Sequence, residues 1–306
     1  MRTLLAFLVL AALASCVSPP SSNHRVGDPV SADPEIDMAY PPAMVPLHFE
    51  VAGSRINGIL YMAAGLGPHP TVLMLQGFPG NEKNADLSQA MRRAGSNVVN
   101  INYRGTWGSE GKFTFANALE DVAYIVAKFR DPGWADRYRS DPDQIAIVGH
   151  SFGGFLGASI GSRDQGVACY VHLAGMDLGV LGKMVQSNDE LRIAFTQMFE
   201  GDMDSSGGPV HGNARTLIET AIEHAEAYSL QRQATDLSTR PLLLVAAVND
   251  QVLPKSVYHD PLVSALRKAG ATRVTEAVYD DDHVFSSHRI SLARKIVEWQ
   301  SEQCWH

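Results

Sequence analysis

Three cysteines in a chain of 306 residues are too few for a disulfide scaffold, and they suggest no cysteine metal site. A surplus of basic side chains is also missing, because 33 acidic residues against 25 basic ones give a formal net charge of -8. A nucleic-acid partner would need a basic surface, so that class of function is excluded. Hydrophobic residues make up 45% of the chain, which is enough for a sizeable core.

The N-terminus has the pattern of a secretory signal. Arg2 precedes an apolar stretch, residues 4–14, that is too short to cross a bilayer and has the length of a signal-peptide core. The following "LASC" resembles the bacterial lipobox, which implies a signal peptide over residues 1–15 and acylation of Cys16. We therefore expect a protein of the bacterial cell envelope that is anchored to a membrane by lipid, on the periplasmic side or the cell surface. The alternative is a secreted protein in which Cys16 is incidental.

Residues 16–46 connect the lipobox cysteine to the folded body. Seven of the 16 prolines lie in residues 17–46, which show little apolar periodicity, so we predict an extended tether. Of the other two cysteines, Cys169 lies in the apolar run "VACYVHL" and is expected in the core, whereas Cys304 lies close to the C-terminus. The sequence leaves open whether these two are free or bonded.

Strand and helix patterns alternate from residue 47 to residue 302. "LHFEVAG" and "INGILYMA" predict a β-hairpin, and continuous apolar runs such as "TVLMLQ", "IAIVG" and "PLLLVAAV" predict strands buried on both faces. Helical patterns separate these runs. The alternation predicts one α/β domain with a mostly parallel sheet and helices on both faces.

Residues 177–238 interrupt this alternation with two or three helices, which we interpret as an inserted lid. Residues 187–190 have capping-box spacing, and Asn213 is placed to cap a second helix. A packed accessory subdomain without gating is the alternative.

The pentapeptide "GHSFG" matches G-x-S-x-G, the nucleophile elbow. In this motif a strained turn projects the serine hydroxyl above the sheet, and Gly149 and Gly153 let neighbouring backbone pack closely. Gly153, Gly157 and Gly161 recur every four residues, which predicts a helix lying tightly against the sheet. We therefore predict that Ser151 is a nucleophile. The alternative is a small residue at a tight turn.

A serine hydroxyl needs a base that a third group orients. Asp250 follows the predicted strand "LLLVAAV", and His283 follows the last predicted strand, so the chain order is serine, acid, histidine. The topology places all three at one edge of the sheet. Ser151, Asp250 and His283 are therefore the predicted catalytic residues.

Three other histidines and an acidic run lie near these positions in the sequence. His288 begins the closing helix, His150 precedes the serine, and His172 lies inside a strand, so we expect structural roles for them. The aspartates at residues 280–282 are too close to His283 to orient it easily. We interpret them as a solvated acidic loop rather than a metal cluster.

An oxyanion hole needs two backbone N–H groups directed at the developing charge. One is expected from Phe152, directly after the nucleophile. The other is expected from Phe78 in the loop "GFPG", where Gly77 gives the turn its freedom and Pro79 has no N–H to donate. That loop is also compatible with a plain β-turn.

Together these motifs resemble an α/β-hydrolase, especially the branch shared by prolyl-oligopeptidase-like and dienelactone-hydrolase-like enzymes. The resemblance covers residues 45–302 and is carried by "QGFPG", "NYRGTWGSEGKFTFANALEDV", "GHSFGG", "NDQVLP" and "DDHVF". It implies hydrolysis through an acyl-serine without a cofactor or metal. Gln76 stands where many relatives have histidine. Arg104, in the second motif, is expected to brace its loop through an ion pair, the alternative being contact with a substrate carboxylate.

Three functions follow from these residues. The first is a serine hydrolase of small-molecule carboxylic esters or thioesters, and the second is a peptidase. For a peptidase, Glu219, Glu223 and Glu226 would recognise a substrate amine, although such a stripe is usually a solvated helix face. The third is a catalytically silent, lipid-anchored binding protein.

Overall fold

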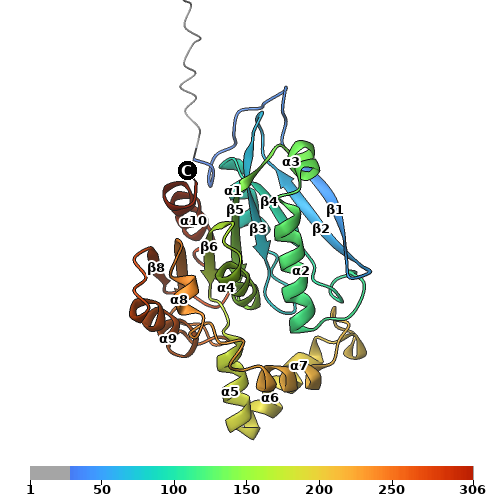
Figure 1. Ribbon diagram of the computed structural model, residues 1–306, viewed down its shortest axis with the longest axis vertical. Helices are drawn as coiled ribbons and strands as arrows, with labels where there is room; N and C mark the ends of the chain where they lie inside the picture. The colour runs from blue at the N-terminus through green and yellow to red at the C-terminus, as the bar shows by residue number, and fades with distance from the viewer. Residues whose placement is uncertain (1–27, 306) are drawn as a thin grey trace, which may run out of the picture.

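An eight-stranded sheet runs through the middle of the molecule, which the computed structural model describes for residues 28–305 (Figure 1). The strand order is β1-β2-β4-β3-β5-β6-β7-β8. The strands are β1 (Ala43–Val51), β2 (Ser54–Met62), β3 (His69–Leu75), β4 (Asn97–Ile101), β5 (Ser140–His150), β6 (Val167–Leu173), β7 (Leu242–Ala247) and β8 (Val274–Tyr279). β1 and β2 form the predicted antiparallel hairpin, and all pairs from β4 to β8 are parallel. The predicted α/β fold is confirmed.

Helices cover both faces of the sheet. On one face lie α1 (Ala85–Arg93) and α10 (Arg289–Gln303), which pack over one hydrophobic cluster. The other face carries a larger cluster beneath α2 (Phe115–Lys128), α3 (Pro132–Tyr138), α4 (Phe152–Arg163) and α9 (Lys255–Lys268). Successive β3 residues alternate between the two clusters, with Met74 in the first and Leu75 in the second. A strand buried on both faces must be apolar throughout, which explains its uninterrupted hydrophobic sequence.

The N-terminal segment differs from the extended tether predicted for it. The predicted signal peptide and Cys16 lie outside the described residues, but residues 28–42 lie within them. β1 begins at Ala43, earlier than predicted. Asp28 accepts a hydrogen bond from Arg294 of α10 at 2.6 Å, and Val30 packs against the cluster under α1 and α10. This end of the segment is therefore docked on the body, because it has both a charged and an apolar partner there.

The insertion between β6 and β7 is helical, as predicted. It contains α5 (Leu178–Ser187), α6 (Asp189–Gly201), a 3₁₀ turn η1 (Asp204–Ser206), α7 (Ala214–Glu223) and α8 (Ala234–Leu237). In Figure 1, α5, α6 and α7 lie beyond one end of the sheet. Asn213 caps α7 as predicted, but the cap of α6 is Asn188, which accepts a hydrogen bond from Leu191 N, because Ser187 still belongs to α5.

The outer part of the insertion is joined to the loop after β4 by backbone hydrogen bonds. His211 N donates to Gly105 O at 2.7 Å, Phe113 N donates to His211 O at 2.8 Å, and Trp107 N donates to Pro209 O at 3.0 Å. Any movement of the whole insertion would break these bonds. The contacts therefore favour a packed subdomain over a freely swinging lid.

A disulfide joins Cys169 of β6 to Cys304, the residue after α10, across 135 residues of sequence. Both cysteines are buried. This answers the question that the sequence left open, and it fixes the end of α10 to a central strand. Among residues 28–305, the helices are all too short or too polar to span a membrane.

Candidate active site

Ser151 occupies a turn between β5 and α4 whose conformation glycine usually adopts. Its φ is 56° and its ψ is -120°, so a non-glycine residue holds a strained backbone here. A Cβ on Gly149 would lie 2.1 Å from Gly153 O, and a Cβ on Gly153 would lie 2.3 Å from Leu75 O. Neither glycine can be replaced without moving backbone, which is the steric demand inferred from the motif.

The same close packing continues along α4. A Cβ on Gly157 would lie 2.8 Å from Ile147 Cγ2, and one on Gly161 would lie 2.2 Å from the ring of Tyr170. The glycine row therefore lets α4 lie directly on β5 and β6, and this contact fixes the height of Ser151 above the sheet.

Asp250 and His283 come together from two loops. Asp250 Oδ1 accepts hydrogen bonds from Val252 N at 2.8 Å and Leu253 N at 2.7 Å, which leaves Oδ2 to face His283 Nδ1 at 2.7 Å. Because a carboxylate accepts, Nδ1 carries the proton, and Nε2 is the nitrogen able to act as a base. Asp250 is only 4% exposed, so this orientation is held in a buried setting.

His283 and Ser151 line one cavity of about 140 Å³. The other lining residues are Gly77, Phe78, Pro79, Gly80, Asn81, Glu82, His150 and Val284. A Cβ on Gly77 would lie 3.3 Å from Ser151 Oγ, so this loop passes directly beside the hydroxyl. The structure thus brings the predicted nucleophile, base and loop to one place.

Both predicted oxyanion donors adjoin Ser151. Phe152 is the first residue of α4, so its N–H has no acceptor within the helix. Phe78 follows Gly77 in the loop beside the hydroxyl, and the Gln76 carbonyl just before it accepts a hydrogen bond from the Tyr103 hydroxyl at 2.8 Å. Having glutamine rather than histidine at residue 76 does not affect this hydrogen bond, because the backbone carbonyl and not the side chain accepts it.

His150 and His172 are buried, and neither contacts a carboxylate within residues 28–305. Burial, together with the nearby His283, lowers the pKa of His150 to about 3, and burial with the nearby His259 lowers the pKa of His172 to about 3. His150 Nε2 donates to the backbone carbonyl of His283 at 2.9 Å. His150 therefore supports the loop of the proposed base as a neutral side chain.

The acidic run before His283 is not simply a solvated loop, and our interpretation was wrong for Asp281. This residue is 6% exposed, and its Oδ2 accepts from His288 Nδ1 at 2.9 Å and from Ser287 N at 3.0 Å. Asp282 Oδ1 accepts from the backbone N–H groups of Val284 and Ser286. Asp281 is therefore buried with its own hydrogen-bond partners, whereas Asp280 and Asp282 are exposed, as the interpretation expected.

Arg104 braces its loop, as expected. It is 5% exposed, and its guanidinium pairs with Asp121 and Glu120. Phe113 packs into a ring cluster with Phe78, with ring centroids 5.2 Å apart, so it supports the loop that is predicted to supply an oxyanion donor.

Of the glutamates proposed to recognise an amine, Glu226 is paired with Lys183 and Arg232, and none of the three lines the cavity at Ser151. Glu82 does line it, and sequence reasoning missed this residue. The available signal was its position a few residues after the loop that is predicted to supply an oxyanion donor.

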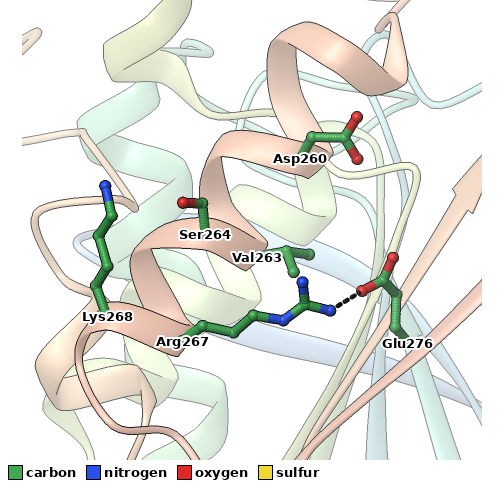
Figure 2. Close-up of a pocket in the computed structure, with 6 residues that line it drawn as sticks. All are labelled: Asp260, Val263, Ser264, Arg267, Lys268 and Glu276. Carbon is green, nitrogen blue, oxygen red and sulfur yellow. Dashed lines mark hydrogen bonds and ion pairs between the residues drawn. The ribbon is translucent and has the colours of Figure 1, made fainter.

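A second hollow of about 450 Å³ lies on α9 and β8 (Figure 2). Ser264 lines it, but no histidine does, and Arg267 and Glu276 form an ion pair across it at 3.1 Å. It therefore lacks the partners that would activate a serine. Within residues 28–305, no cluster of three or more histidine, cysteine or acidic side chains is arranged to hold a metal ion.

Comparison with known proteins agrees with this architecture. A model described as the alpha/beta hydrolase family matches residues 72–294. No curated protein sequence matches the chain.

Solved structures resemble the fold at low sequence identity. An esterase from Pyrococcus furiosus has a TM-score of 0.61 at 15% identity over 86% of this chain and 92% of its own. Est1E from Butyrivibrio proteoclasticus, bound to ferulic acid, has a TM-score of 0.64 at 16% identity over 84% of this chain and 98% of its own. An acylaminoacyl peptidase from Pyrococcus horikoshii has a TM-score of 0.63 at 15% identity over 86% of this chain and 42% of its own. At these identities the likeness concerns the fold alone.

Proposed function

The chain belongs to the alpha/beta hydrolase family, and we propose that it is a serine hydrolase that cleaves carboxylic esters or thioesters. One observation carries the proposal. His283 is hydrogen-bonded to the buried Asp250 and lines the same cavity as Ser151. The strained backbone of Ser151 adds support, because such conformations occur where a reactive group must be held in place.

The reaction follows from this arrangement. Ser151 Oγ attacks the substrate carbonyl carbon while His283 Nε2 takes the hydroxyl proton, and Asp250 stabilises the resulting imidazolium. The N–H groups of Phe78 and Phe152 stabilise the negative charge on the carbonyl oxygen.

The intermediate then collapses. The bond to the leaving alcohol or thiol breaks, and the leaving group takes the proton from His283, which leaves an acyl group on Ser151. A water molecule then gives a proton to His283 and attacks the acyl carbon. The acid is released and the proton returns to Ser151, so the enzyme ends unchanged.

Labelling with a fluorophosphonate probe tests the proposal. We expect covalent attachment at Ser151, and Ser151→Ala should lose both labelling and ester turnover while remaining folded. Ser264→Ala, at the hollow in Figure 2, is the matched control and should label normally. A folded wild-type protein that neither reacts with the probe nor cleaves esters would instead be a binding protein.

Graded chromogenic esters compared with amino-acid anilides then separate an esterase from a peptidase. We expect faster cleavage of the esters. Faster cleavage of the anilides would favour the peptidase, the activity named for the structurally similar protein from Pyrococcus horikoshii.

For its location, we propose a lipid-anchored protein of the cell envelope. The lipobox-like "LASC" motivates this proposal, and the Cys169–Cys304 disulfide supports export because such bonds persist in oxidising compartments. Cys16→Ser should abolish incorporation of a labelled fatty acid and release the protein from the membrane fraction. Unchanged fractionation and labelling would contradict the anchor.

A further inference from the structure

One carboxylate gives the cavity at Ser151 a negative charge. Of the residues that line it, Glu82 is the one with a carboxylate, and burial keeps His150 neutral. Glu82 Oε1 accepts a hydrogen bond from Asn84 N at 2.6 Å, which holds the side chain in place. Within residues 28–305, no other hydrogen bond or ion pair engages this carboxylate, so its second oxygen is available to a ligand.

Two cations lie near Glu82, but both have other partners. Lys83 Nζ donates to Asn102 Oδ1 at 2.8 Å and lies 4.6 Å from the centre of the Trp107 ring. Arg289 binds both carboxylate oxygens of Asp86. The charge of Glu82 contributes to the raised pKa of Arg289, yet no ion pair joins the two side chains among the described residues. The cavity therefore retains a negative charge in a partly enclosed site, where such a charge acts strongly on a cation.

The position of Glu82 relative to the base indicates which part of a substrate it would meet. Arg289 donates to Asn84 Oδ1 at 3.0 Å and to Val284 O at 2.9 Å, and so links the Glu82 turn to the His283 loop. In acyl transfer the histidine protonates the leaving group, which therefore departs on the histidine side of the site. Glu82 and His283 line the same cavity, and the Arg289 contacts join the two segments that carry them, which favours a place for Glu82 on that side.

We propose that Glu82 selects esters whose leaving alcohol carries a positively charged amine, as in an ester of an amino alcohol. This inference rests on the proposed serine-hydrolase function and narrows its substrate class. The ammonium group would be attracted to the free carboxylate oxygen while the ester carbonyl lies at Ser151. The net charge of -8 would favour the approach of such a substrate.

A pair of esters with the same shape and different charge tests the proposal. Acetylcholine carries a quaternary nitrogen where 3,3-dimethylbutyl acetate carries a carbon, so the ratio of their kcat/KM values isolates the effect of charge. We expect the wild type to prefer the cationic ester, and Glu82→Gln to lower the ratio about tenfold. Glutamine keeps an oxygen that can accept from Asn84 N. High salt should lower the wild-type ratio and leave that of E82Q nearly constant.

Glu50→Gln is the control, because it removes the same unit of charge from an exposed site on β1. It should keep the wild-type ratio. An equal ratio in wild type and E82Q, with Ser151-dependent cleavage of either ester, would overturn the role of Glu82 and leave the serine-hydrolase proposal standing. Absence of both turnover and fluorophosphonate labelling would overturn the proposed function.

Protection from labelling gives a readout that needs no turnover. Choline should protect Ser151 from the fluorophosphonate at lower concentration than its neutral isostere 3,3-dimethyl-1-butanol does, and this advantage should disappear in E82Q. Equal protection by both alcohols in the wild type would contradict the proposal even if neither acetate is cleaved.

Discussion

Two aspartate–histidine pairs have histidines that are close in sequence, and their hydrogen bonds are nearly the same. His283 Nδ1 is 2.7 Å from Asp250 Oδ2, and His288 Nδ1 is 2.9 Å from Asp281 Oδ2. Both carboxylates are buried. His283 of the first pair lines the cavity at Ser151, whereas His288 occupies the N-cap position of α10 and its ring packs against that of Tyr279. The hydrogen bond alone therefore does not identify a catalytic base, and the position relative to the nucleophile does.

The Asp281–His288 pair also contacts the loops that carry Asp250 and His283. Asp281 binds His288 and Ser287 N, and so closes the turn of chain that contains His283. Asn249 N donates to Asp281 O at 3.0 Å, which joins that turn to the loop of Asp250. We interpret the Asp281–His288 pair as a structural support that holds the two loops of the proposed catalytic pair together.

The largest expected contrast is between the two histidines. His283→Ala should lower kcat by as much as about 10⁶-fold, the effect of losing a triad base in a serine hydrolase. His288→Ala should keep kcat within a fewfold of wild type, because its ring does not line the cavity. Steady-state kinetics on a chromogenic ester, with circular dichroism to verify folding, measures both. The comparison fails if H288A loses activity while H283A retains it.

We expect the two aspartates to differ in the same way as the two histidines, with a smaller effect on kcat. Asp250→Asn should lower kcat by about 10⁴-fold, because an amide neither selects the same tautomer nor stabilises the imidazolium. Asp281→Asn should mainly lower the free energy of unfolding, by about 1–3 kcal/mol, since it weakens a buried hydrogen-bonded group. Kinetics and urea denaturation separate the two effects. A rate loss in D281N as large as that in D250N would remove the distinction between the pairs.

Much of this organisation was accessible from the sequence, because it depends on local patterns. The apolar runs predicted the parallel strands, and the spacing of Gly153, Gly157 and Gly161 predicted the close contact of α4 with the sheet, which the structure confirms. Asp250 and His283 were found because parallel strands end at one edge, so that topology alone brought distant residues together. Their catalytic roles stay predictions.

The sequence did not predict the burial of Asp281, the disulfide or the place of Glu82, because these depend on how distant segments and loop side chains pack together. An acidic triplet reads as solvated, yet Asp281 is buried by backbone donors of its own turn. The disulfide requires knowing that α10 ends beside β6, which no local pattern encodes. Glu82 follows the predicted oxyanion loop by a few residues, but only the shape of the cavity shows that it lines the site.

The disulfide lies at the C-terminal end of α10, the opposite end of the helix from His288. α10 begins after His288 and ends at Cys304, so both of its ends are fastened to the body. Replacing Cys169 and Cys304 together with alanine should lower the free energy of unfolding by about 5 kcal/mol, the loop-entropy value for a closure of this length. Urea denaturation of the variant and of the reduced wild type measures it.

The kcat of the folded double variant should stay near that of wild type, because neither cysteine lines the Ser151 cavity. A loss of stability below 1 kcal/mol would show that the helix is held by packing alone. A large fall in kcat would show that the end of α10 acts on the catalytic loop, contrary to the division proposed for the two pairs.

The smallest expected effect comes from a histidine with no acid partner. Burial holds the pKa of His172 at about 3, below the value near 6.5 of an unfolded chain. Between these two values the unfolded state binds a proton that the folded state does not, so stability is full above pH 6.5 and falls as the pH drops. The loss is about 1.4 kcal/mol per pH unit.

His172→Phe keeps an aromatic ring and removes this proton, so between pH 7.5 and pH 5.5 it should lose about 1.4 kcal/mol less than wild type in urea denaturation. His224→Gln, at an exposed position, should behave as wild type. Equal losses in H172F and wild type would mean that His172 is protonated in the fold, and that burial without a carboxylate does not suffice to keep a histidine neutral beside this site.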